Sequence, residues 1–170
     1  GRWIEVATFR SDGQYLDGRH PVEVHFCDAR HDALRRDFTV NGMFLDPLKG
    51  EIIDYVGGRA DLDARVIRAI GEASERFAED HLRLLRAVRF AARLDFAIEP
   101  ATLTAIQANA GNLARVAPER VREELEKILR HARRAAGLQM LRDTGLLAYL
   151  WPDAVWHAGA LREAAETLAA

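Results

Sequence analysis

Cysteine is almost absent from this sequence, because Cys27 is the only one among 170 residues. A single thiol excludes an internal disulfide framework and a zinc site built from several thiolates. Long apolar runs are absent too, since no run approaches the roughly 20 residues that cross a bilayer. No charged and then apolar leader opens the chain. These absences predict a cytoplasmic protein without membrane contact.

Lysine is scarce as well, although basic residues are not. Lys49 and Lys127 are the only lysines among 24 basic residues, so 22 are arginines. Arginine forms bidentate contacts with phosphates and base edges, although a GC-rich genome would give the same bias. The net charge of −2 excludes a polycation drawn to nucleic acid by charge alone. A hydrophobic share of 49% is that of a globular protein with a core of its own.

The first part of the chain has the pattern of strands and turns. Residues 10–21 form a polar, turn-rich loop, and residues 47–50 predict a hairpin connection. The segments rich in strand-forming residues are 3–9, 22–26, 43–46, 51–55 and 66–70. The chain begins at Gly1, within the first of these, which predicts a piece of a longer protein.

From about Ser74 the pattern becomes helical. Predicted helices begin at Pro100 and Pro118, because proline is favoured at the first helical position. Further helices are predicted over residues 80–94, 135–144 and the alanine-rich segment after Pro152. The predicted class is therefore α+β, with an α/β part at residues 1–72 and an all-α part at residues 73–170.

The most informative segment is Glu79-Asp80-His81-Leu82-Arg83-Leu84-Leu85-Arg86. If it is a single helix, Glu79, Asp80, Arg83 and Arg86 lie within an arc of roughly 120°. One interpretation is a solvated helix face with ion pairs between successive turns. The other is that Asp80 and Arg83 together hydrogen-bond the edge of a nucleobase.

Several further segments occur in a fixed order with this one. Together they resemble the family of class II tRNA nucleotidyltransferases (CCA-adding enzymes) and bacterial poly(A) polymerases, over about residues 1–150. The segments are Ile4–Arg10, Arg35-Arg36-Asp37-Phe38-Thr39-Val40-Asn41, Asp54-Tyr55-Val56-Gly57-Gly58, Asp61-Leu62, Arg76–Asp80, Arg83–Phe90, and Glu119-Arg120-Val121 with Glu124-Leu125.

The resemblance implies the C-terminal part of a polymerase-β-type nucleotidyltransferase head domain, followed by an all-α neck domain that begins the RNA-binding body. It also implies two divalent metal ions, expected to be Mg²⁺, held by paired aspartates upstream of residue 1. The chain is thus expected to be a fragment without that catalytic motif. Glu5 is the candidate third carboxylate near the metals, and its alternative is a surface glutamate on an edge strand.

The resemblance also assigns residues to nucleotide binding. Asp80 and Arg83 would contact the base, Glu79 would orient Arg83, and Arg86 would support the pocket. The run at residues 35–37 would hold the ribose and phosphates. The full set is Asp32, Arg35, Arg36, Asp37, Asn41, Glu79, Asp80, Arg83 and Arg86.

Other features depart from the family pattern or have a simpler explanation. Asp61-Leu62-Asp63 imitates the aspartate motif, but the family has a structural Asp-Leu there that begins a short helix. Gly42 and Phe44 replace the small residues usually seen after Asn41. Three arginines lie near the end of a predicted helix: Arg130, Arg133 and Arg134. They either contact an RNA backbone or stabilise the helix C-terminus, where the helix dipole favours positive charge.

The expected function is the addition of C and A residues from CTP and ATP to tRNA 3′ ends, as part of a longer enzyme. The turn-rich loop at residues 10–21 favours tRNA, because CCA-adding enzymes have a flexible loop there. Poly(A) addition is the alternative within the same class. A non-catalytic RNA- or nucleotide-binding module is the alternative from another class.

Overall fold

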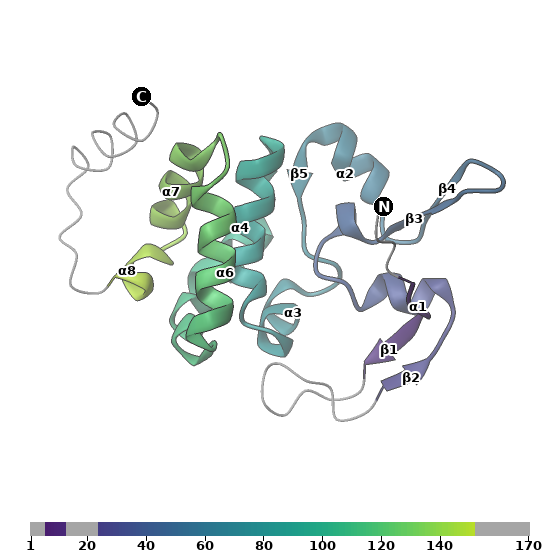
Figure 1. Cartoon of the computed structure of the whole chain (residues 1–170), viewed down its shortest axis with the longest axis horizontal. Helices are drawn as coiled ribbons and strands as arrows, with labels where there is room; N and C mark the ends of the chain where they lie inside the picture. Colours follow the sequence, from purple (N-terminus) through teal and green to yellow (C-terminus); the bar gives the residue numbers. More distant parts are fainter. Residues whose placement is uncertain (1–5, 13–23, 152–170) are drawn as a thin grey trace.

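The computed structural model describes residues 6–12 and 24–151. Figure 1 shows strands and short helices on one side of the molecule and a bundle of helices on the other. The α+β class predicted from the sequence is therefore confirmed. Among the described residues, no helix is both long and apolar enough to span a bilayer. The predicted strand at residues 3–5, Glu5 and the predicted helix after Pro152 lie outside the described residues.

The strands form three separate pairs, β1–β2, β3–β4 and β5–β6. The predicted hairpin is confirmed: β3 and β4 are antiparallel with Phe44 opposite Ile53, and the tight loop ends at Gly50 with φ +68°. The strand bounds are β1 Arg10–Asp12, β2 Val24–Phe26, β3 Met43–Asp46, β4 Glu51–Asp54, β5 Val66–Ile67 and β6 Ala97–Ile98.

The predicted strand at residues 3–9 is wrong for residues 6–9, which have no strand structure. Strand β1 instead begins at Arg10, inside the predicted loop, and pairs with β2 from Arg10↔Phe26 to Asp12↔Val24. Pairing through backbone groups accommodates polar residues such as Ser11, so the side-chain pattern gave no signal for this strand. The strand predicted at residues 66–70 is shorter, and Ala69 makes only an isolated bridge to Phe38.

The helices supply most of the core. Helix α4 lies at its centre: Leu84, Leu85 and Val88 have no exposed surface, and α4 packs against α6 and α7. The helix bounds are α1 Ala29–Leu34, α2 Gly58–Ala64, α3 Ala73–Glu79, α4 Arg83–Leu94, α5 Pro100–Asn109, α6 Pro118–Leu129, α7 Arg134–Asp143 and α8 Leu147–Leu150, with 3₁₀ turns η1 Thr39–Asn41 and η2 Ala110–Arg115.

The helix predicted from Asp80 to Leu94 is confirmed over Arg83–Leu94, but its first three residues lie outside it, because the chain breaks between α3 and α4. Asp80 is extended, with φ −147° and ψ 104°. Its carboxylate accepts a hydrogen bond from the Leu82 amide at 3.0 Å, which competes with helix continuation. Asp80 and Arg83 are therefore not on one helical face, and the arc calculated for a continuous helix does not apply.

A buried ion pair joins the two longest helices. Arg89 of α4 donates to Glu124 of α6, whose side chain is 2% exposed, and Lys127 contacts the second carboxylate oxygen at 2.9 Å. The guanidinium of Arg89 also lies 4.0 Å from the centre of the Phe90 ring. Breaking a buried pair leaves an uncompensated charge, so these contacts hold α4 and α6 in a fixed relation.

Candidate nucleotide-binding site

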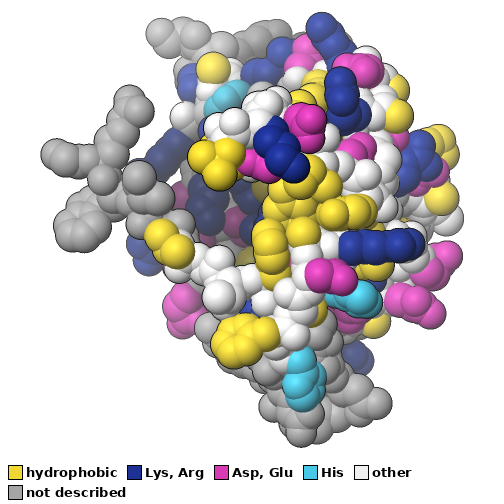
Figure 2. Space-filling view, turned by 90° about the vertical axis from the view of Figure 1, so that its right-hand side faces the viewer, with side chains coloured by type: hydrophobic (Ala, Val, Ile, Leu, Met, Phe, Trp, Pro, Cys, Tyr) yellow, Lys and Arg dark blue, Asp and Glu magenta, His cyan; other side chains and the backbone are white. Residues whose placement is uncertain are grey.

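The structure brings all nine residues predicted to bind nucleotide into one region, built from two segments of chain. One segment comprises α1 and the turn after it, and the other comprises the α3–α4 junction and α4. Arg86 of α4 pairs with Asp37 at 2.6 Å, and Arg83 donates to the backbone oxygen of Arg35 at 3.2 Å. Figure 2 shows a recess with basic and acidic side chains at its base, beside a patch of hydrophobic side chains.

Asp32 organises the first segment. Its carboxylate is 3% exposed and accepts from Arg35 at 2.6 Å and from Arg36 at 2.9 Å, one arginine on each oxygen. Burial alone would raise the pKa of Asp32, but the hydrogen bonds from both arginines outweigh it and hold the pKa below its ordinary value. One carboxylate thus orients two guanidinium groups.

Asp37 connects the two segments. One of its carboxylate oxygens accepts from the Phe38 amide at 2.9 Å and from the Asn41 side chain at 3.0 Å. The other accepts from Nε of Arg86 at 2.7 Å. In this structure, Asp37 therefore joins Asn41 of the first segment to Arg86 of α4.

Arg83 is held in place but retains donors for a ligand. Its side chain is 10% exposed, and Nη1 donates to Glu79 at 2.5 Å and to the backbone oxygen of Arg76 at 2.9 Å. With the contact from Nη2 to Arg35, three of its five N–H hydrogens are used. Two remain for a further acceptor. Glu79 also accepts from Arg76 at 3.1 Å, so it fixes two arginines at once.

Arg120 is a site residue to which the sequence assigned no role. Its Nη2 lies 2.8 Å from the carboxylate of Asp80, and the two side chains are 23% and 18% exposed. Arg120 comes from the first turn of α6, 40 residues away in sequence. The only sequence signal was its place in Glu119-Arg120-Val121, one of the segments that carry the family resemblance.

The region is rich in guanidinium groups. Among the described residues, its ion pairs join six arginines to four carboxylates. The arginines are Arg35, Arg36, Arg76, Arg83, Arg86 and Arg120, and the carboxylates are Asp32, Asp37, Glu79 and Asp80. Guanidinium groups form bidentate contacts with phosphates, so the region is suited to an anionic ligand such as a nucleoside triphosphate.

Two other acidic residues have structural partners. Asp61, in the segment that imitates the aspartate motif, is 7% exposed and accepts from Thr39 at 2.7 Å and from Arg68 at 3.1 Å. Asp54 caps helix α2 by accepting from the amides of Gly58 and Arg59. Burial alone would raise the pKa of Asp54, but the backbone hydrogen bonds outweigh it and lower the pKa.

The arginines near the end of α6 are also paired. Arg130 lies 3.4 Å from Glu126, and Arg133 forms an ion pair with Asp95.

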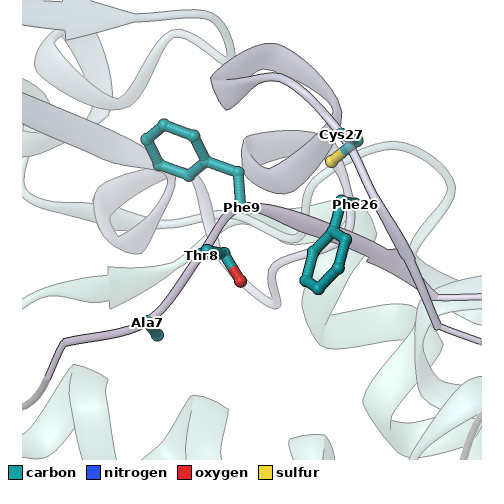
Figure 3. A pocket seen from close by; sticks show the side chains of 5 residues that line it. All are labelled: Ala7, Thr8, Phe9, Phe26 and Cys27. Carbon is teal, nitrogen blue, oxygen red and sulfur yellow. The ribbon is translucent and has the colours of Figure 1, made fainter.

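Two pockets lie elsewhere in the described residues. One has a volume of about 430 Å³ and is lined by Ala7, Thr8, Phe9, Phe26 and Cys27, whose side chains are drawn in Figure 3. The second lies between η2, α6 and the segment ending at Trp151. Neither contains any of the nine predicted residues. Within residues 6–12 and 24–151, no three His, Cys, Asp or Glu side chains converge as metal ligands would.

Comparison with known families gives two matches that lie in order along the chain. Residues 1–68 match the poly A polymerase head domain. Residues 95–156 match a family described as the probable RNA and SrmB-binding site of polymerase A.

Individual relatives agree with these matches. The CCA-adding enzyme of Geobacillus stearothermophilus is 47% identical over 151 residues, which cover 88% of this chain and 37% of that enzyme. The enzyme of Limosilactobacillus reuteri (strain DSM 20016) is 46% identical over 150 residues, with the same coverage. The chain thus spans a little over a third of the length of these relatives.

Solved structures show the same likeness. The crystal structure of the Bacillus stearothermophilus CCA-adding enzyme in complex with CTP matches with a TM-score of 0.79 at 43% identity, covering 93% of this chain and 38% of that one. A tRNA nucleotidyltransferase complexed with a primer tRNA and an incoming ATP analog matches with a TM-score of 0.75 at 33% identity, covering 82% and 42%. These matches confirm the resemblance that the ordered sequence segments indicate.

Proposed function

Since the chain belongs to the family of class II tRNA nucleotidyltransferases and bacterial poly(A) polymerases, we propose that the full-length protein adds C and A residues from CTP and ATP to tRNA 3′ ends. Residues 1–72 would be the C-terminal part of the head domain, and residues 73–170 the neck and the start of the body. The observation that carries the proposal is that Arg83 is held by three hydrogen bonds with two N–H donors unused, while the carboxylate of Asp80 is fixed by Arg120.

The chemistry of the bases explains why this pair suits CTP and ATP. Cytosine and adenine carry an exocyclic amino group, whereas uracil and guanine carry a carbonyl oxygen at the corresponding position. The carboxylate of Asp80 accepts from an amino group and repels a carbonyl oxygen. Cytosine and adenine also present a ring nitrogen acceptor beside the amino group. The remaining N–H donors of Arg83 would hydrogen-bond that ring nitrogen.

The phosphates and ribose would lie against the first segment. Arg35 and Arg36 are both oriented by Asp32, and guanidinium groups form bidentate contacts with phosphates, so they are the groups proposed to bind the triphosphate and ribose. Asp37 and Asn41 would line the same wall, with Arg86 supporting it.

Mg²⁺ is proposed as the cofactor of the full-length enzyme, in which it would activate the RNA 3′ hydroxyl and stabilise the departing pyrophosphate. The described residues do not form a metal site by themselves. Glu5, the proposed third carboxylate, is outside them. The described side chains are accordingly assigned to binding and orienting the nucleotide. We propose a cytoplasmic location, where tRNA and both nucleotides are present.

Incubation of the purified full-length enzyme with tRNA lacking its 3′ CCA, Mg²⁺ and each nucleotide tests the proposed function. The expected product carries two C residues and then one A. Long tracts of A would identify a poly(A) polymerase, and binding of nucleotide without incorporation would identify a non-catalytic module.

Arg120 gives a prediction about nucleotide choice. In the full-length enzyme, Arg120→Ala is expected to lower the preference for CTP over UTP by about fivefold to tenfold. The reason is that Arg120 holds the carboxylate oxygen of Asp80 that the Leu82 amide does not bind. This change in preference corresponds to roughly 1 kcal/mol, at the upper end for partly exposed ion pairs. The measurement is the ratio of incorporation efficiencies for the two nucleotides.

Arg122→Ala is the matched control, since Arg122 lies on the same helix and pairs with Glu126 at 2.9 Å but is 81% exposed. It should leave the ratio unchanged. Equal shifts for the two variants would mean that Arg120 acts only through the stability of α6.

A further inference from the structure

Arg36 is the more exposed of the two arginines whose guanidinium groups contact Asp32, yet its guanidinium is held on several sides. Its side chain is 36% exposed, compared with 25% for Arg35. Nε and Nη2 both donate to one oxygen of Asp32, at 3.1 and 2.9 Å, and Nη1 donates to the backbone oxygen of Asn41 at 2.9 Å. Three of five N–H hydrogens are used in this way, and two remain for a ligand.

These hydrogen bonds lie in the plane of the guanidinium, and an aromatic ring covers one of its faces. The central carbon of Arg36 lies 4.8 Å from the centre of the Phe44 ring, within the range of a cation–π contact. The Phe44 ring is itself oriented by Phe9, whose ring is 5.2 Å away at an angle of 74°. Such an edge-to-face pair is a favoured aromatic geometry.

The backbone around Phe44 is fixed by close packing on both sides. Phe44 is paired with Ile53 across the β3–β4 hairpin. Two residues earlier, a β-carbon at Gly42 would lie 2.6 Å from a methyl group of Val56, so only glycine permits this approach without movement of the side chain. The ring of Phe44 therefore has a defined position relative to Arg36.

We propose that Phe44 is a positioning residue for nucleotide binding, which acts by holding Arg36 with its two remaining donors directed toward the phosphates or ribose. The ring excludes water from one face of the cation, so the charge is less hydrated and contacts with an anion on its open side are strengthened. This inference rests on the proposed function, in which Arg36 contacts the nucleotide.

Substitution of Phe44 by leucine in the full-length enzyme tests the proposal, because leucine keeps the apolar bulk and lacks the π face. Phe44→Leu is expected to raise the KM for CTP and for ATP by about twofold to fivefold, the size of a cation–π contact near the surface. The KM values for CTP and ATP should rise together, because Arg36 is proposed to contact the phosphates or ribose that both nucleotides share. The value of kcat should change by less than KM. Phe44→Tyr keeps the ring and should restore the original KM.

Leu45→Ala is the control, because Leu45 is the next residue of β3 and its side chain is 64% exposed on the other face of the strand. It should leave both KM values unchanged. A KM for Phe44→Leu equal to that of the unchanged enzyme would mean that Phe44 only fills space, and would overturn the proposal.

A double-mutant cycle with Arg36→Met provides the second measurement. If Phe44 acts through Arg36, then Phe44→Leu should have little further effect on KM once the guanidinium is gone. Full additivity of the two effects would contradict the inference. An unchanged enzyme that neither binds CTP nor incorporates it would instead refute the proposed function, so the two failures are distinguishable.

Discussion

Replacement of Arg83 by alanine in the full-length enzyme is expected to reduce the discrimination between correct and incorrect nucleotides by about tenfold to a hundredfold. Two N–H donors of Arg83 are unused within the described residues, and the proposed bidentate contact with the base would be worth roughly 1–3 kcal/mol of discrimination. Alanine also leaves Glu79 with Arg76 as its only partner in the recess. The measurement is the set of incorporation efficiencies for CTP, ATP, UTP and GTP.

Arg93→Ala is the matched control for this experiment. Arg93 lies in the last turn of the same helix, α4, and is exposed. It should leave the nucleotide ratios unchanged and affect stability by a small amount at most. If Arg83→Ala and Arg93→Ala shift the ratios equally, Arg83 belongs to a solvated network of ion pairs and does not contact the base.

Asp32→Asn is expected to raise the KM for CTP and ATP by about tenfold or more, with equal effects on the two. The asparagine side chain replaces one carboxylate oxygen by an NH₂ group. This group is a donor, so it cannot accept a hydrogen bond from the guanidinium group that it faces. Each lost hydrogen bond to a charged group costs roughly 1.5–3 kcal/mol. Arg35 and Arg36 would then lose the carboxylate that orients both guanidinium groups, which weakens the proposed phosphate site.

Asp28→Asn is the control for Asp32→Asn, because it makes the same chemical change in the same helix. Asp28 caps α1 by accepting from the His31 amide at 2.9 Å, and asparagine is an equally good capping residue. Its side chain is 65% exposed. An equal rise in KM for the two variants would show that the effect comes from the stability of α1.

The same aspartate predicts a pH dependence of stability. Since the pKa of Asp32 is lowered in the folded protein, its contribution to stability is present above its ordinary pKa and is lost as the pH falls through the lowered value. The stability difference between the unchanged protein and Asp32→Asn should therefore be constant near neutral pH and decrease below about pH 4. Thermal unfolding of both proteins between about pH 3 and pH 7 measures it. A difference that does not change with pH would contradict the role of the ionised carboxylate.

The sequence predicted the helical part of the fold better than the strands. Prolines and a glycine are local signals, and Pro100, Pro118 and Gly145 begin or end elements as expected. Strands β1 and β6 were not predicted, because each depends on a partner that is distant in sequence. Helix α8 was missed as well, since it has only one turn between Gly145 and Pro152.

For the candidate site, the motifs identified the residues but not their partners. The ordered segments predicted that Arg35–Asp37 and Glu79–Arg86 belong together, and the contact between Asp37 and Arg86 brings them together. Helical periodicity wrongly placed Asp80 on the face of Arg83, because a side chain that caps its own backbone interrupts the helix. The contacts of Arg120 with Asp80 and of Phe44 with Arg36 depend on tertiary packing, which no local pattern encodes.

The short parallel pair β5–β6 bears on how the molecule can move. Strand β5 precedes helices α3 and α4 in the sequence and β6 follows them, so the pair joins the two ends of this helical unit. The amide of Ala97 donates to the backbone oxygen of Arg65, and the amide of Glu99 donates to that of Ile67. A hinge at residues 66–72 would have to break these bonds before the head could rotate away from α4. Adjustment between a pyrimidine and a purine is therefore expected to take place by rotation of the Asp80 and Arg83 side chains, or by a shift of α6, while the head and α4 move as one body.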